Sequence, residues 1–98
     1  MDILQINKLD NVAVALKDLA KGDIVSANDF TVTVQEDIPS GHKIALKNIA
    51  AGENIIKYSF PIGHADGAIA PGSHVHTHNL KTNLGSILSY EYNPVAPV

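Results

Sequence analysis

The sequence contains no cysteine and no arginine among its 98 residues. The absence of cysteine excludes disulfide bonds, thiolate nucleophiles and cysteine-ligated zinc. Arginine supplies the bidentate contacts to bases and phosphates on which nucleic-acid-binding proteins depend, and here seven basic residues against ten acidic ones leave a net charge of −3. We therefore expect no nucleic-acid partner.

Long apolar runs are also missing. No segment approaches the ~18 apolar residues of a transmembrane helix, and the first residues lack the basic region of a signal peptide. An apolar fraction of 45% with 17% charged residues is nevertheless typical of a globular domain. We expect one soluble, cytoplasmic domain at residues 1–89 with no membrane partner, followed by a proline-containing tail or linker at residues 90–98.

Charged residues are scarce in the C-terminal part of the chain. Residues 59–98 contain only Asp66, Lys81 and Glu91 as formal charges, although four histidines lie there. Such a stretch either forms most of the core or packs on another domain or subunit, because protein interfaces are depleted of charge. The sequence leaves both interpretations open.

One pattern occurs four times: an apolar residue, two residues, a glycine, two residues and a second apolar residue. Its glycines are Gly22, Gly41, Gly52 and Gly72. Because glycine adopts positive φ without a Cβ clash, we interpret each segment as a single helical turn that the glycine closes before a strand begins. The spacings are too irregular for a solenoid, so we attribute the repetition to the chemistry of strand ends and not to a repeat architecture.

Seven short segments rich in β-branched residues alternate with turn-forming residues and are predicted to be strands. They are residues 3–6, 12–15, 30–34, 43–45, 54–58, 62–65 and 73–76. So many short strands favour a mostly β fold, a compact β-clip or small barrel with single helical turns, over a two-sheet sandwich.

The densest chemical signal is the run from His74 to Asn79, in which His74, His76 and His78 alternate with other residues. On a strand these three imidazoles would share one face, and neutral imidazole is a ligand for Fe²⁺, Mn²⁺ or Zn²⁺. Same-face neighbours lie ~6–7 Å apart, so we expect two ligands with the third histidine as an acid–base or hydrogen-bonding group. The alternative is a polar strand end whose histidines are solvated or bonded to the backbone.

Other candidates are weaker. His42 and Lys43 follow a glycine turn and could hold a substrate carboxylate, whereas exposed His-Lys pairs are also common without a ligand. His64 is expected to line an interface or to be satisfied locally. Asp10 and Asn11 precede an apolar run and are expected to cap a turn through their side chains, with a ligand contact from Asn11 as the alternative.

Five motifs, in order, resemble the N-terminal SAF domain of the altronate dehydratase family, which also includes galactarate dehydratase and sulfolactate sulfo-lyase. These motifs are residues 10–16, 38–46, 55–58, 61–63 and 74–79, and the similarity covers about residues 6–94. The HxHxHN run and the closing Tyr-x-Tyr-x-Pro are closer to the altronate branch than to the galactarate branch.

The resemblance implies a β-clip (SAF, antifreeze-like) fold and a hydro-lyase that acts on a sugar acid. In the altronate branch the reaction converts D-altronate to 2-dehydro-3-deoxy-D-gluconate and water. The implied cofactor is Fe²⁺ or Mn²⁺, shared with a large catalytic chain. The residues that carry the implied roles are His74, His76 and His78 as metal ligands, His76 and His78 as catalytic groups, and His42, Lys43 and Asn79 as substrate contacts.

The large catalytic domain of the family is absent from this sequence. We therefore expect either the small subunit of a two-chain enzyme or a fragment of a longer one, which does not turn over substrate alone. The alternatives are a small subunit of a sulfolactate sulfo-lyase and a non-catalytic SAF binding or assembly module, since fold alone does not fix function. A homo-oligomer is a further expectation that the sequence leaves open.

Overall fold

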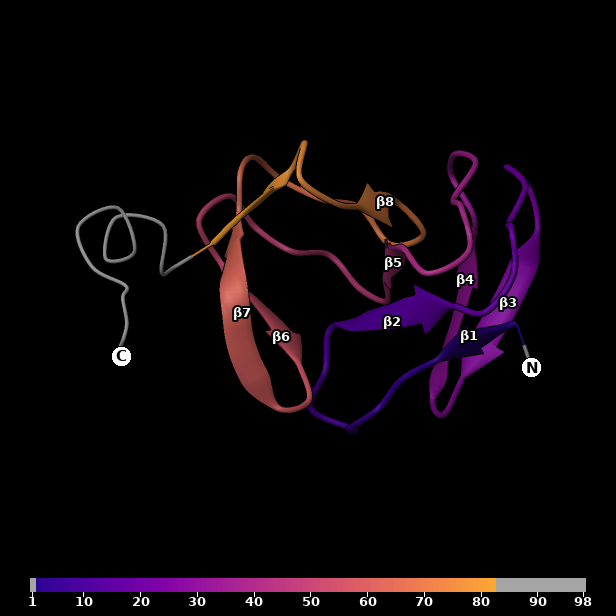
Figure 1. Cartoon of the computed structure of the whole chain (residues 1–98), viewed down its shortest axis with the longest axis horizontal. Coiled ribbons are helices and arrows are strands. Elements are labelled where there is room, and N and C mark those ends of the chain that lie inside the picture. Colours follow the sequence, from indigo (N-terminus) through magenta and orange to yellow (C-terminus); the bar gives the residue numbers. More distant parts are fainter. Residues whose placement is uncertain (1, 83–98) are drawn as a thin grey trace.

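The structure is a computed structural model that describes residues 2–82, and in that range it consists of short strands joined by turns (Figure 1). The strands are β1 (Ile3–Leu4), β2 (Val12–Ala15), β3 (Ile24–Ala27), β4 (Phe30–Thr33), β5 (Lys43–Ala45), β6 (Asn54–Lys57), β7 (Phe60–Ala65), β8 (His74–Val75) and β9 (Leu80–Lys81). The predicted mostly β fold is confirmed. No helix long and apolar enough to cross a membrane is present in the described range.

A central antiparallel sheet with strand order β1-β2-β5-β8 holds the molecule together. The β3–β4 hairpin flanks it at one end and the β6-β7-β9 sheet at the other (Figure 1). Strands β2 and β5 are apolar at nearly every position because side chains from both of their faces are buried, as expected for inner strands covered on two sides.

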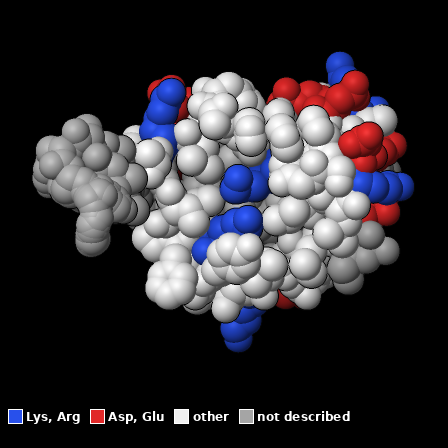
Figure 2. Space-filling model, viewed as in Figure 1, with Lys and Arg blue, Asp and Glu red and all other residues white. Residues whose placement is uncertain are grey.

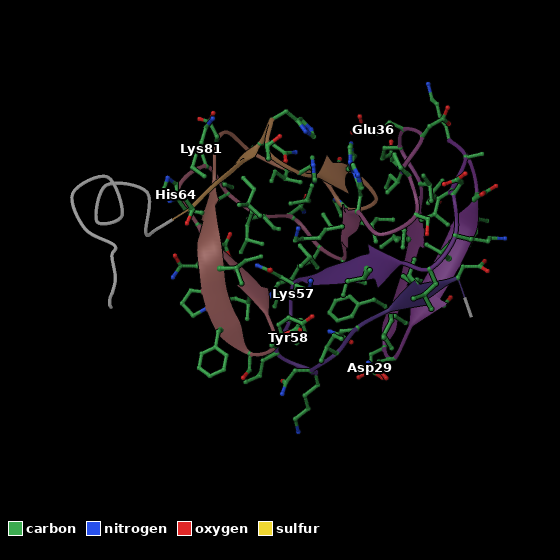
Figure 3. All side chains as sticks on the ribbon, viewed as in Figure 1. Asp29, Glu36, Lys57, Tyr58, His64 and Lys81 are labelled. Carbon is green, nitrogen blue, oxygen red and sulfur yellow. The ribbon has the colours of Figure 1, made fainter. Side chains whose placement is uncertain are left out.

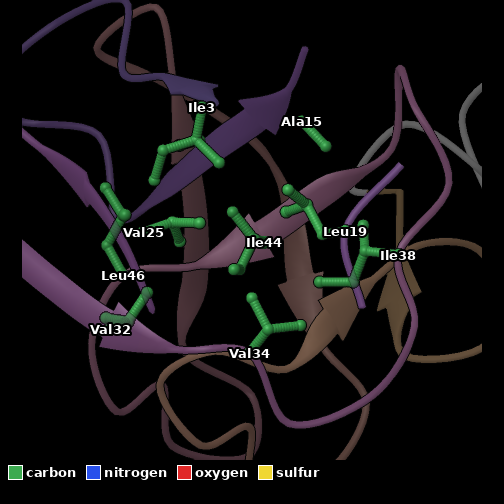
Figure 4. Packing of buried hydrophobic residues seen from close by; sticks show 10 residues of the cluster. Ile3, Ala15, Leu19, Val25, Val32, Val34, Ile38, Ile44 and Leu46 are labelled. Atoms are coloured by element: carbon green, nitrogen blue, oxygen red, sulfur yellow. The ribbon is translucent and has the colours of Figure 1, made fainter. Parts of the chain in front are cut away.

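Alternation along β2 and β5 divides the core into two clusters. Ala13, Ala15 and Ile44 belong to a first cluster with residues of the β3–β4 hairpin (Figure 4), whereas Val12 and Ala45 belong to a second cluster with residues of β6 and β7. Successive side chains of a strand point to opposite faces, so each short strand contributes to both clusters. A chain of this size thereby obtains two small cores from one sheet.

The four glycine motifs form β-turns, and the predicted single helical turns are wrong. In each turn the fourth residue donates its N–H to the carbonyl of the first, at 2.9–3.1 Å, and the glycine at the third position has φ between 82° and 96°. That arrangement requires positive φ at the third position, which glycine adopts without strain. The turns span residues 20–23, 39–42, 50–53 and 70–73.

These turns form two equivalent pairs, which follow one another along the chain. Leu19 bridges Ile38 in the first pair, and Ile49 bridges Ile69 in the second. We call the segment from β2 to β5 the first unit and the segment from β5 to β8 the second unit, so that the two units share β5. The N–H of Gly41 donates to the carbonyl of Ala15 in the first unit, and the N–H of Gly72 donates to the carbonyl of Ala45 in the second, both at 2.8 Å. The prediction that the repeated motif reflects only the chemistry of strand ends is therefore incomplete, because a larger clip-like unit of strands and turns occurs twice.

Asp10 and Asn11 join the two units. The side chain of Asn11 donates to the carbonyl of Asn54 at 3.0 Å and accepts from the N–H of Ile56 at 2.7 Å. Asp10 accepts from the N–H of Ser59 at 2.7 Å, and Asp10 and Asn11 are each only 2% exposed. The predicted structural role is confirmed, but the bonds reach 43 to 49 residues along the chain and are not merely a local cap.

All seven predicted strands exist, and their ends differ from the predicted ones by at most two positions. Two strands were missed: β3, which is exposed at alternate positions, and β9, which has only two residues. The predicted strand at 73–76 is limited to His74–Val75, because residues 76–79 turn and the N–H groups of Asn79 and Leu80 both donate to the carbonyl of His76. The predicted tail at residues 90–98 lies outside the described residues.

Candidate metal centre

Three histidines meet where the turn before β5 lies beside β8. Single ring nitrogens of His42, His74 and His76 all lie within 4.8 Å of one another. Nδ1 of His42 and Nε2 of His74 are 2.8 Å apart, a hydrogen bond in which one ring is the donor and the other the acceptor. The rings are stacked, with centroids of His42 and His76 only 4.0 Å apart. The three residues are half-buried.

Backbone pairing between distant segments produces this arrangement. His42 closes the turn of residues 39–42, and its carbonyl accepts from the N–H of Ala15. The next strand, β5, pairs with β8 in a register that sets Ile44 opposite His74. The turn therefore presents His42 beside the start of β8, and two histidines separated by 32 residues in sequence come into contact.

His74 and His76 belong to the group, as predicted, but its third member is His42 and not His78. The strand ends after Val75, so the expected single face carrying three imidazoles does not form. The ring of His78 is tilted against that of His74 with centroids 5.1 Å apart, and His78 is exposed. His78 is thus an exposed neighbour of the three-nitrogen group.

Asn79 fixes the segment that carries the histidines. Its Oδ1 accepts from the N–H of His76 at 3.0 Å, and its Nδ2 donates to the carbonyl of His74 at 2.8 Å. The side chain thus spans the two residues whose rings contribute to the group. Asn79 was expected as a substrate contact, whereas its observed contacts are with the backbone of the histidine segment.

The electrostatics of the site favour neutral imidazoles at His74 and His76. Partial burial lowers the pKa of His74 below its ordinary value, and the neighbouring His78 and His42 lower it further, against an opposing effect of Glu36. Desolvation, His42, Lys43 and His78 likewise lower the pKa of His76. A neutral imidazole has a free lone pair, so both rings are in the form that binds a metal ion at neutral pH.

The donor set fits a divalent transition metal. Imidazole nitrogens bind such ions at about 2.0–2.1 Å, which sets two nitrogens on one ion about 3 Å apart. The separation of 2.8 Å between the nitrogens of His42 and His74 is close to that value, and the 4.8 Å limit for the whole group requires only small ring movements. Imidazole suits Fe²⁺ better than it suits hard cations such as Mg²⁺.

Lys43, the second residue after Gly41, is the cation next to this group. It is half-buried on β5, and burial followed by the charge of Lys57 lowers the pKa of its ammonium. Figure 2 shows lysine atoms in the middle of one face, where the surrounding surface is uncharged and the acidic atoms lie nearer the edges. Lys57 is labelled near the centre of the same view in Figure 3.

The remaining candidates lie elsewhere. His64 is on β7 beside Lys81, at the end of the molecule away from β3 and β4 (Figure 3). Two surface hollows of about 400 and 480 Å³ lie over the Leu19–Ile38 and Ile49–Ile69 bridges, and no histidine lines either of them. The histidine group therefore lies outside both of these hollows.

Sequence reasoning missed Glu36 and Lys57. Glu36 precedes the turn of residues 39–42 and accepts from the N–H of His74 at 3.2 Å through its Oε2, a contact between residues 38 positions apart. Lys57 was included in a motif but given no role. The scarcity of charge around Lys57 was a usable signal, because no acidic residue lies between Glu53 and Asp66.

Comparisons with known proteins give one consistent result. Residues 1–83 match the altronate/galactarate dehydratase SAF domain family. The chain is 53% identical to an altronate dehydratase of Escherichia coli over 96% of its length and 48% identical to that of Bacillus subtilis over 93%. It is also 53% identical, over 56% of its length, to the (2R)-sulfolactate sulfo-lyase subunit alpha of Paracoccus pantotrophus, of which the match covers 82%. The matched regions are only 19% and 18% of the two altronate dehydratases.

Proposed function

The chain belongs to the altronate/galactarate dehydratase SAF domain family, and from this premise we propose that it is the SAF module of a hydro-lyase that converts D-altronate to 2-dehydro-3-deoxy-D-gluconate and water. The observation that carries the proposal is the identity of 53% and 48% to two altronate dehydratases over nearly the whole chain. The three-nitrogen histidine group provides the chemistry that such a module can contribute.

In this proposal His42, His74 and His76 hold the metal ion, Fe²⁺ or Mn²⁺. Their ring nitrogens lie close together and the residues are only half-buried, so ligands from a second chain can complete the site. Lowered pKa values keep His74 and His76 neutral, as metal ligands must be. An ion bound there would supply a Lewis acid for the oxygens of the substrate. Asn79 acts as a positioning residue, because it holds the backbone of His74 and His76.

The side chains of this module have separate tasks in the dehydration. Lys43 binds the carboxylate and favours the negative charge that develops there when the C2 proton leaves. His78, outside the ligand group and exposed, takes the C2 proton on a ring nitrogen and donates a proton to the C3 hydroxyl, so that the C3–O bond breaks and water departs. The enol that remains becomes the 2-keto acid by a proton shift.

A large catalytic domain or chain completes the site. The chain spans about a fifth of the length of the altronate dehydratases that it matches. The related sulfolactate sulfo-lyase chain is named as a subunit, which supports a separate partner as one arrangement. The half-buried position of the histidine group, outside both surface hollows, agrees with a cavity that forms on assembly.

The test is a dehydration assay on the chain alone and together with the dehydratase-like large chain recovered with it from a native extract. We expect release of the keto acid from D-altronate only by the pair, and loss of at least ~10²-fold in kcat when His74→Ala removes a metal ligand. Lys8→Ala, at an exposed position before Asp10, is the matched control with unchanged kcat. Turnover by the chain alone, or by the pair carrying His74→Ala, would contradict the proposal.

A sulfolactate sulfo-lyase is the second candidate function. The observation that favours it is the 82% coverage of a short subunit alpha by this chain. The two candidates differ in their product, so the same pair is assayed with sulfolactate. Release of sulfite from sulfolactate without dehydration of D-altronate would replace the first candidate by the second. A chain that recovers no large partner and binds no Mn²⁺ or Fe²⁺ would instead be a binding or assembly module.

A further inference from the structure

Exposed apolar side chains gather around the turn between β6 and β7. Tyr58 lies in that turn and Phe60 begins β7, and both are exposed. Ile6 and Leu9 are exposed in the loop that joins β1 to β2. In the described part of the chain, these four are the majority of the seven large apolar residues that are exposed. We call Ile6, Leu9, Tyr58 and Phe60 the apolar patch.

One buried carboxylate holds the two segments of the patch together. Figure 1 shows the loop between β1 and β2 passing beside the turn between β6 and β7. The carboxylate of Asp10 accepts from the N–H of Asn7 at 3.0 Å and from the N–H of Ser59 at 2.7 Å. Each of these N–H groups belongs to a residue next to a member of the patch. Because both converge on one side chain, the four apolar side chains belong to a single region of the surface.

A polar relay continues from Asp10 to the other hairpin. The side chain of Gln5 donates to the carbonyl of Asp10 at 2.8 Å and accepts from the side chain of Asn28 at 2.6 Å. Asn28 lies in the turn between β3 and β4 and, like Tyr58 and Ser59, has positive φ. Such a conformation is costly for residues other than glycine and persists only where the surroundings hold it. The relay thus keeps the backbone under the patch in one shape, which reduces the conformational entropy lost on binding.

The charges around the patch have one sign. Lys8 and Lys57 are the only formal charges in residues 3–9 and 54–63. Nζ of Lys57 lies 4.8 Å from the centre of the Tyr58 ring, and Tyr58 is labelled close to Lys57 in Figure 3. Lys8 is exposed in the loop, whereas the carboxylate of Asp10 is buried. An apolar surface with a positive border is complementary to an apolar hollow bordered by carboxylates.

We propose that the apolar patch is a docking surface for the large catalytic part of the same enzyme, which receives it in an apolar hollow bordered by carboxylates. Contiguous exposed apolar residues mark interaction sites on soluble domains, and aromatic side chains such as Tyr58 and Phe60 are frequent anchors there. About four fifths of each matched altronate dehydratase lies outside the region similar to this chain, so a large partner is available to cover the patch. The inference rests on the proposed function for the identity of this partner.

The first experiment compares side-chain exposure in the chain alone and in the assembled enzyme, by hydroxyl-radical footprinting read by mass spectrometry. We expect oxidation of Tyr58 and Phe60 to fall several-fold on assembly. Ile24 is the matched internal control, because it is 70% exposed on β3 against 68% for Phe60, and its oxidation should stay unchanged. Unchanged oxidation of Tyr58 and Phe60, or equal protection of Ile24, would overturn the inference.

Substitution tests whether the covered side chains stabilise the assembly. Phe60→Ser should weaken the affinity of the chain for the large chain roughly 30-fold or more, as expected for an aromatic anchor, whereas Ile24→Ser should leave it unchanged. Both variants should keep the folded amide spectrum of the chain, because both side chains are mostly exposed. If Phe60→Ser does not fold, Leu9→Ser from the other segment of the patch replaces it. Equal affinity of the wild type and a folded patch variant would contradict the docking role.

Measurements on the isolated chain distinguish the other occupants. In sedimentation velocity we expect no dimer that depends on Phe60, and a dimer that Phe60→Ser dissociates would assign the patch to a second copy of the chain. In flotation with vesicles of phosphatidylcholine and phosphatidylglycerol we expect no binding, and binding that Phe60→Ser abolishes would assign the patch to an anionic lipid surface. Either of these assignments would overturn the inference.

Activity assays separate this inference from the proposed function. If the pair dehydrates D-altronate and the patch is oxidised as in the chain alone, the docking surface is wrong and the proposed function stands. If Tyr58 and Phe60 are protected in a pair that does not dehydrate D-altronate, the docking surface stands and the proposed reaction is wrong. Phe60→Ser that lowers the rate at limiting large chain, with normal kcat when the large chain is saturating, supports both.

Discussion

Replacement of Asn79 by alanine tests whether the histidine group depends on the turn that follows β8. The change removes the acceptor of the His76 N–H and the donor to the His74 carbonyl, and it leaves both imidazoles in the sequence. The N–H groups of Asn79 and Leu80 still donate to the carbonyl of His76, so the turn keeps its main-chain bonds. The expected effect is a loosening of the two histidines relative to His42, without unfolding of the domain.

The magnitude follows from the two lost bonds. A part-buried hydrogen bond between neutral groups contributes about 1 kcal/mol net, so the pair contributes about 2 kcal/mol, equivalent to about 30-fold in an equilibrium constant. The loss should affect the local order of residues 74–79 more than the global stability, because the bonds lie at the edge strand of the central sheet.

Amide hydrogen exchange of His76 measures this effect directly, and titration with Mn²⁺ measures its consequence. In Asn79→Ala we expect faster exchange of the His76 N–H, by up to ~30-fold, and Mn²⁺ affinity reduced by no more than the same factor. Asn48→Ala, at an exposed asparagine, is the matched control that changes neither. Exchange and Mn²⁺ affinity as in the wild type would refute the positioning role of Asn79.

Two further outcomes concern stability. Gly72→Ala should cost roughly 3 kcal/mol, because an added Cβ would overlap the carbonyl oxygen of Thr33 at a residue with φ of 85°, whereas Gly52→Ala, with similar φ and open space, should cost only about 1–2 kcal/mol in urea unfolding. Since the pKa values of His74 and His76 are lowered in the folded chain, the unfolded chain binds more protons below about pH 6.5, so stability should fall as pH decreases below that value. His74→Gln should reduce this pH dependence, and an identical pH profile in the variant would show that His74 does not cause it.

Local patterns predicted the strands well because each strand is short and bounded by residues with strong turn preferences. β2 and β5 were predicted with the observed ends, since Asp10 and Asn11 precede the first and the glycine turn at Gly41 precedes the second. β3 was missed because its exposed Ile24 and Ser26 give it no apolar run. Its pairing with β4 is set by the hairpin and not by its own composition.

The histidine group was only partly predictable for a different reason. The HxHxH run identified the segment, but the strand ended at Val75, so His78 lies in a turn with its ring tilted against that of His74 and is not one of the three grouped ligands. His42 joined them through the β5–β8 register, which no spacing within the run specifies. Asn11 shows the same limit, because its side chain was expected to bond locally and its partners are Asn54 and Ile56 of the other unit.

The twofold use of one clip-like unit has an evolutionary consequence. Duplication of one such segment yields two copies that begin with the same fold, and each can then diverge as long as the other preserves the shared sheet. Gly41 and Gly72 occupy equivalent turns, so Lys43 in the first copy corresponds to His74 in the second. A duplication of one unit would account for this correspondence, with a cation at the copied position in one unit and an imidazole in the other. In the function proposed above, the carboxylate contact and one of the metal ligands would then stand at equivalent positions of the two units.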